Sequence, residues 1–165
     1  GLQNEPVPIP TDAKVAFVDA LSETGARDIE VSAFVSPKWV PQMADAAEII
    51  RTLGGVSIIP HPEIDRGYPF GAKISFIREH LLGLVDAIED ISTGHGYEKN
   101  FGEQLGLSSI GSSDDHFNML IGTTVTAYDS RRHPDFLSAV RARETQAVKI
   151  ENSLQPFIAA GRMVF

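Results

Sequence analysis

An aspartate and a histidine stand two positions apart just after a short apolar run, in residues 110–116 (IGSSDDH). In extended backbone such side chains point to the same side, so Asp114 and His116 would converge. A carboxylate and an imidazole together suit a divalent cation such as zinc, manganese or iron. His61 follows a second apolar run, in residues 58–62 (IIPHP). The three residues predict a metal site, and the alternative is a polar turn beside a surface histidine.

The composition limits what else the chain can do. It has 165 residues, of which 42% are hydrophobic and 22% charged, as expected for a single globular domain. A net charge of −8 without a basic patch argues against nucleic-acid binding. Because there is no cysteine, a metal would be held by His, Asp, Glu or Asn. No apolar run is long enough for a membrane span, so the expected location is the cytoplasm.

Helical and strand patterns alternate along the chain. Helices are expected at residues 11–24, 41–53, 74–84, 101–105 and around 136–140, with a weak helix from 154 onward. Strands are expected at residues 28–34, 56–59, 85–91, 107–110, 123–128 and 147–150. The alternation predicts an α/β fold with a mostly parallel sheet and crossover helices.

Chemistry-bearing residues recur where these strands end. Glu30, His61, residues 92–95 and residues 114–116 all fall at or near predicted carboxyl ends of strands. Sites in such folds form at that edge of the sheet. The clustering favours one shared metal or anion site.

The first 45 residues resemble the beginning of 3-hydroxy-3-methylglutaryl-CoA (HMG-CoA) lyase, a metal-dependent (β/α)8 enzyme. The similarity is carried by residues 1–5 (GLQNE) and 29–45 (IEVSAFVSPKWVPQMAD). It implies that Gln3 and Glu30 match substrate-pocket positions. The Arg-Asp pair that precedes the first word in the family, and the family's distal His-x-His motif and cysteine loop, have no counterpart in this sequence.

Residues 46–165 are similar to the C-terminal part of a PHP (polymerase and histidinol phosphatase) domain, a family of metal-dependent phosphoesterases on a distorted β/α barrel. The similar segments are residues 54–62 (GGVSIIPHP), 85–89 (VDAIE) and 111–116 (GSSDDH), followed by 121–124 (IGTT). The resemblance implies that His61, Asp114 and His116 are metal ligands. The family's N-terminal His-x-His motif and the ligands after it are not present, so the implied ligand set is incomplete.

The two resemblances describe one domain, residues 1–165, made of a lyase-like segment (1–45) and a PHP-like segment (46–165). A complete β/α barrel needs about 200–250 residues, so we expect a partial or open barrel-like arrangement. Its open strand edges would be covered by a partner, such as a second copy of the chain.

Three functions follow as hypotheses. The first is metal-assisted hydrolysis of a small phosphorylated substrate, in which Lys38 and Arg66 would hold the phosphate unless they simply face water. The second is a non-catalytic join of two barrel fragments. The third is C–C bond cleavage of the HMG-CoA lyase type. His95, in the loop at residues 93–97, is either a fourth ligand or acid, or an exposed residue without a role.

Overall fold

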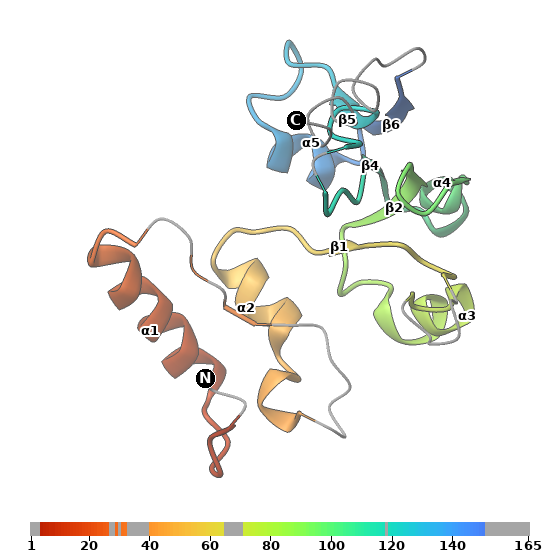
Figure 1. The fold of residues 1–165 in the computed structure, drawn as a ribbon. Coiled ribbons are helices and arrows are strands. Elements are labelled where there is room, and N and C mark those ends of the chain that lie inside the picture. The colour runs from red at the N-terminus through yellow and green to blue at the C-terminus, as the bar shows by residue number, and fades with distance from the viewer. Residues whose placement is uncertain are drawn as a thin grey trace, which may run out of the picture. The chain divides into compact units, whose positions relative to one another are not determined.

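The computed structural model describes residues 4–26, 29, 31–32, 40–64, 71–117 and 119–150. The chain divides into two compact units, Gly1–Ser57 and Ile58–Phe165. The expected join at residues 45–46 lies within the first unit. Each unit is described separately below (Figure 1).

The described part of the first unit contains helix α1 (Thr11–Glu23), the 3₁₀ turn η2 (Pro41–Met43) and helix α2 (Ala46–Thr52). Lys14 of α1 is buried, and its ammonium group donates to the Gln42 carbonyl and, at 2.8 and 2.9 Å, to both carboxylate oxygens of Asp45. Thr11 donates to the same carboxylate at 2.8 Å. These bonds join the start of α1 to the residue that precedes α2.

The side chain of Gln42 ties the amino-terminal segment to η2. Its amide nitrogen donates to the carbonyls of Glu5 at 2.9 Å and Val7 at 2.6 Å, and its oxygen accepts from Ile9 N–H at 3.1 Å. A prolyl-rich segment makes no helix or sheet bonds of its own, so a buried amide satisfies its backbone groups instead.

The second unit is built on a sheet in which strand β2 (Ala87–Ser92) is central and buried along its whole length. It pairs in parallel with β1 (Ile58–Ile59) and β4 (Ser108–Ser112), and antiparallel with the short β3 (Tyr97–Glu98). Helical segments α3 (Ile74–Phe76) and η3 (Ile77–Leu81) connect β1 to β2, and α4 (Phe101–Leu105) leads into β4. The core that holds this sheet contains Ile59, Ile77, Val85, Ile88 and Leu107.

A second, two-stranded sheet pairs β5 (Thr124–Tyr128) with β6 (Thr145–Lys149), with helix α5 (Phe136–Ala142) between them in the chain. It packs closely on β4, because a Cβ added at Gly111 would lie 2.5 Å from the Val125 carbonyl oxygen. The Thr126 hydroxyl accepts from the Gly111 N–H and donates to the Gly111 carbonyl, both at 3.0 Å. Thr145 likewise donates to the Ser109 carbonyl at 2.7 Å.

The structure confirms the predicted α/β class with a mostly parallel sheet. It also confirms the helix at residues 11–24 and the strand at 85–91, each within two residues at its ends. Strand β3 was not predicted. The expected strand at 28–34 falls largely, and the helix from 154 entirely, outside the described residues. No helix in the described part of the chain is long and apolar enough to cross a membrane.

Candidate metal and acid–base site

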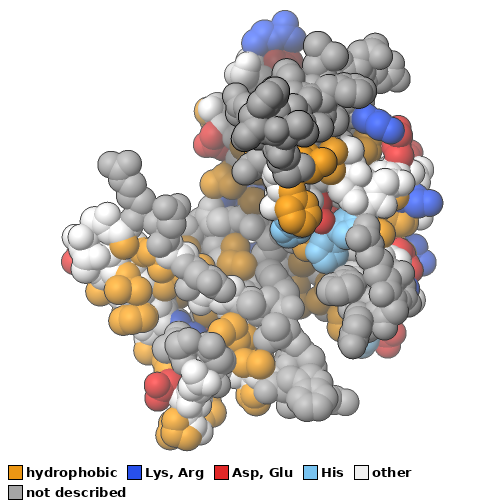
Figure 2. All heavy atoms as spheres, viewed as in Figure 1, with side chains coloured by type: hydrophobic (Ala, Val, Ile, Leu, Met, Phe, Trp, Pro, Cys, Tyr) orange, Lys and Arg blue, Asp and Glu red, His pale blue; other side chains and the backbone are white. Residues whose placement is uncertain are grey.

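The loops that follow β1, β2 and β4 bring His61, His95 and Asp114 to one edge of the second unit's sheet. The three strands are parallel, so their carboxyl ends share that edge. Each residue comes two or three positions after the end of its strand. The sequence-based expectation that strand-end residues meet is therefore met for these three loops. Figure 2 shows histidine side chains gathered beside an acidic one on this unit.

Asp114 is the carboxylate at the centre of the site. Its Oδ2 lies 2.7 Å from His95 Nε2, and its Oδ1 lies 3.6 Å from His116 Nε2. Its backbone has a φ of 45°, in the left-handed region, and its N–H donates to the Ser112 hydroxyl at 3.0 Å. The shorter contact is at ion-pair distance, and an ionised carboxylate can only accept a proton from the ring. His95 and Asp114 therefore form a close acid–base pair.

The loop that carries His95 lies directly against the loop that carries Asp114. Thr93 and Gly94 donate their N–H groups to the carbonyls of Ser112 and Ser113, at 3.2 and 2.9 Å, and so extend the pairing of β2 with β4. A Cβ at Gly94 would lie only 2.7 Å from the Ser113 oxygen and 2.8 Å from the Asp114 oxygen. Glycine is therefore required at position 94 for this approach.

A buried carboxylate supports the other histidine. Glu89, 2% exposed on β2, accepts from the backbone N–H of His61 at 2.5 Å and from the Tyr97 hydroxyl at 2.8 Å. Burial, and then the hydrogen bond to Glu89, raise the pKa of the Tyr97 hydroxyl far above its ordinary value, so it remains a donor. The Tyr97 ring in turn stacks on His95, with centroids 6.4 Å apart and planes at 18°. Glu89 and Tyr97 thus link both histidines.

The rings of the two histidines are in edge-on contact, and each has a buried nitrogen without a hydrogen-bond partner. The centroids of His61 and His95 are 5.1 Å apart, with their planes at 66°. The Nδ1 atoms of both rings are buried and have no hydrogen-bond partner. An unpartnered buried nitrogen costs about 1–3 kcal/mol, so this pair has capacity for a ligand that the fold itself does not use.

Of the predicted metal ligands, His61 and Asp114 both contact His95, whereas His116 lies at the rim with its side chain 75% exposed. In the part of the chain that the structure describes, no group of three or more His, Asp or Glu side chains is placed to hold a metal ion. The predicted substrate residues fall outside the described residues; they are Gln3, Glu30, Lys38 and Arg66.

Sequence reasoning missed Glu89 and Tyr97 and left the role of His95 open. Glu89 could have been found, because a charged side chain within the apolar run of β2 needs buried hydrogen-bond donors. Tyr97 gave no such signal, since β3 has only two residues and pairs through a turn.

Asp115 supports the loop after β4 and not the histidines. Its carboxylate accepts from the N–H groups of Phe117, Leu120 and Ile121 at 3.0 to 3.1 Å. Desolvation raises the pKa of Asp115, but these backbone hydrogen bonds outweigh it and hold the pKa below its ordinary value. Asp115 therefore remains a carboxylate that organises the loop.

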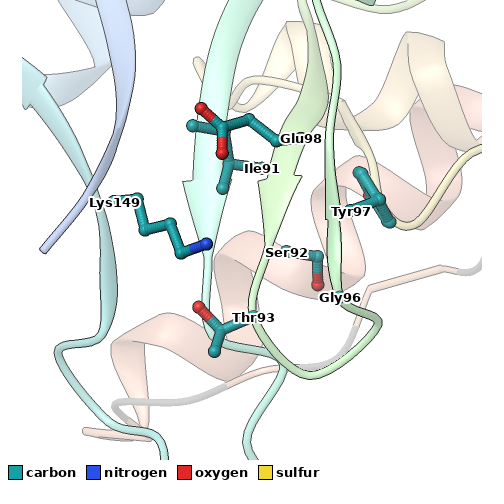
Figure 3. Close-up of a pocket in the computed structure, with 7 residues that line it drawn as sticks. All are labelled: Ile91, Ser92, Thr93, Gly96, Tyr97, Glu98 and Lys149. Carbon is teal, nitrogen blue, oxygen red and sulfur yellow. The ribbon is translucent and has the colours of Figure 1, made fainter. Parts of the chain in front are cut away.

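A small cavity of about 210 Å³ opens beside the end of β2 (Figure 3). Lys149 of β6 and Tyr97 of β3 line it on opposite sides of the strand. Ser92 and Thr93 also line it, and Thr93 shares a hydrogen bond with Thr124 of β5. Tyr97 therefore lines the cavity and also stacks on His95.

Comparison with known proteins gives one consistent answer. The chain is 55% identical over 88 residues to the rat cytoplasmic 3-hydroxy-3-methylglutaryl-CoA lyase, which covers 53% of this chain and 22% of the lyase. It is 57% identical over 51 residues to the human cytoplasmic lyase (31% of this chain, 14% of the lyase), and 48% over 62 residues to the chicken mitochondrial lyase (38% and 21%). The chain thus spans about a fifth of the length of these relatives.

Solved structures of the same enzymes are also similar in part. The Bacillus subtilis HMG-CoA lyase matches 66% of this chain and 41% of its own, at 26% identity and a TM-score of 0.32. The lyase from Pseudomonas aeruginosa matches 74% and 56%, at 22% identity and a TM-score of 0.31. No family model matches the chain.

These findings correct the first functional hypothesis. The prediction of a PHP-type phosphoesterase, and with it of a hydrolase, is wrong: the matched relatives are lyases, and no family model supports a PHP domain. The physical reason is that the PHP-like words are short strand ends followed by Ser, Asp and His, which many α/β sites share. The longer lyase-like words in residues 1–45 agree with the relatives.

Proposed function

We propose that the chain supplies part of the acyl-CoA site of a C–C bond-cleaving lyase of the HMG-CoA lyase type. The observation that carries the proposal is the 55% identity over 88 residues with the rat lyase. The substrate side of that site would include Gln3 and Glu30, the positions that match the family's pocket.

The geometry of the first unit supports this proposal. The two lyase-like words, residues 1–5 and 29–45, are far apart in sequence. Gln42, near the end of the second word, accepts Ile9 N–H and donates to Glu5 and Val7. The fold therefore fixes the segment that follows Gln3 against the end of the second word, as a shared pocket requires.

The test is turnover of 3-hydroxy-3-methylglutaryl-CoA by the full chain with magnesium or manganese, followed by chromatography of the CoA thioesters. We expect binding of the CoA thioester, and any cleavage above the protein-free rate, to be lost in Gln3→Ala and Glu30→Ala. Asn4→Ala, a change at the exposed neighbouring residue, is the matched control and should leave the rate unchanged. If the chain neither cleaves nor binds a CoA thioester, that result contradicts the proposal.

We propose a second property for the second unit, binding of a divalent cation at the edge where His61, Asp114 and His116 were predicted to act. The observation that favours it is the pair of buried Nδ1 atoms without partners, next to the carboxylate of Asp114. Zinc, manganese or iron would be the expected ions. Elemental analysis of the purified chain should find close to one ion per chain after incubation with zinc or manganese. A chain that retains neither ion would contradict this property.

A further inference from the structure

We propose that His61 and His95 are a chelating pair that binds a transition-metal ion through their Nδ1 atoms, with Asp114 as the carboxylate that orients His95. This inference rests on the proposed cation binding of the second unit and assigns its donor atoms. It moves Asp114 and His116 out of the predicted ligand set and adds His95.

The first argument is the close contact of His95 with Asp114. Nε2 of His95 lies 2.7 Å from Oδ2 of Asp114, and a carboxylate at that distance favours a proton on Nε2, which leaves Nδ1 as the nitrogen with a free electron pair. A histidine that binds a metal through one nitrogen usually donates the other N–H to a carboxylate, which fixes the ring and raises the basicity of the ligand. Asp114 and His95 already have that arrangement.

The second argument is the distance between the two rings. If two imidazoles bind one tetrahedral ion at metal–nitrogen distances of about 2.0–2.1 Å, their ring centroids lie about 5 Å apart. The centroids of His61 and His95 are 5.1 Å apart. Both Nδ1 atoms are buried and unpartnered, so binding displaces no hydrogen bond of the fold.

The third argument is that the backbone of His61 and the ring of His95 are held in place before any ligand arrives. Glu89 binds the backbone N–H of His61, whose φ of 31° is rare for a non-glycine residue. Tyr97, held by the same carboxylate, stacks on His95. A pre-arranged pair loses little side-chain freedom on binding, which favours affinity.

The donor chemistry selects the ion. Imidazole nitrogen suits zinc, copper, iron and nickel, whereas magnesium and calcium prefer oxygen donors. Two imidazoles leave two positions of a tetrahedral ion open to solvent or to a further ligand. We therefore expect zinc and cobalt to bind, and magnesium not to compete at equal concentration.

The test is titration of the full chain with zinc and with cobalt, by calorimetry and by the visible absorption of cobalt. His61→Ala and His95→Ala should each abolish the absorption of tetrahedral cobalt. Asp114→Asn, which keeps an acceptor oxygen, should weaken zinc binding by about 10- to 100-fold without abolishing it. The matched control is His80→Ala, since His80 is half exposed on η3 and should leave affinity unchanged.

Long-range ¹H–¹⁵N spectra of the histidines give a readout that a loss of folding would not mimic. We expect zinc to shift the Nδ1 resonances of His61 and His95 while Nε2 of His95 stays protonated. Binding that survives in His95→Ala, or a shift at His95 Nε2, would overturn the assignment of donors but leave cation binding intact. Absence of any zinc or cobalt binding would overturn both.

Discussion

Two carboxylates, Asp45 in the first unit and Asp114 in the second, are held in contrasting ways. Asp45 faces the ammonium group of Lys14, whose three donors go to Gln42 and to both oxygens of Asp45. Asp114 faces the imidazole of His95, whose second nitrogen is buried without a partner. A pair that uses all its donors serves the fold alone, whereas a pair with a donor atom left over retains capacity for a ligand.

Breaking the pair of Lys14 and Asp45 should give the largest loss of stability. Lys14→Ala leaves the Asp45 carboxylate without its cation, and we expect a loss of about 3–5 kcal/mol in the free energy of unfolding. Urea unfolding followed by the fluorescence of Trp39, whose position lies in the first unit's sequence, measures it.

The exposed ion pair between Lys73 and Glu63, 3.3 Å apart, provides a control. Lys73→Ala should cost no more than about 1 kcal/mol, since both side chains are largely in water. Equal losses in Lys14→Ala and Lys73→Ala would mean that the buried pair is not what holds α1 in place.

The second unit should be most sensitive at the carboxylate behind the site. Glu89→Ala leaves the His61 N–H and the Tyr97 hydroxyl without an acceptor, and we expect a loss of about 3 kcal/mol. Glu79→Ala, a change at an exposed carboxylate on η3, is the control and should lie within about 0.5 kcal/mol of the parent. Thermal unfolding by circular dichroism compares them, and a similar midpoint for both variants would show that Glu89 is not a structural acceptor.

Substitutions of two glycines in one loop distinguish the effect of close packing on stability from the effect of backbone strain. Gly94→Ala should lower the free energy of unfolding by about 1–3 kcal/mol and move His95 away from Asp114. The reason is that the new methyl group would lie 2.7 and 2.8 Å from backbone oxygens. Gly96→Ala meets nothing within 4 Å and should cost only the strain of its φ of 69°, about 1–2 kcal/mol. The histidine ¹⁵N spectrum should change in Gly94→Ala alone; identical spectra for the two variants would contradict the packing argument.

Titration of Asp45 with acid should produce the smallest of these effects on the first unit. Although desolvation raises the pKa of Asp45, the hydrogen bonds from Lys14 and Thr11 outweigh it and lower that pKa below its ordinary value. The resulting stabilisation is complete above the unfolded pKa of about 3.9 and is lost as the pH falls through the lower folded value. Stability measured between pH 5 and pH 2 should fall less steeply in Asp45→Asn than in the parent, and equal slopes would contradict this.

The sequence predicted the sheet more fully than the site. Apolar runs ending in Pro-His or Ser-Asp marked β1 and β4 correctly, because a buried parallel strand leaves a clear hydrophobic pattern. His61 and Asp114 followed from that placement. The contact between His95 and Asp114 could not be predicted, since it depends on Gly94 letting one loop pass against the other. The phosphoesterase prediction was wrong because short sequence segments do not define an activity.

The hydroxyl groups along β4 have a consequence for how the protein avoids self-association. Thr126 and Thr145 bond the Gly111 and Ser109 backbone on the side of β4 away from β2. An exposed strand edge is a template for adding a strand from another molecule, and here side chains already occupy those positions. Another strand could therefore pair with this edge of β4 only after β5 and β6 had detached from it.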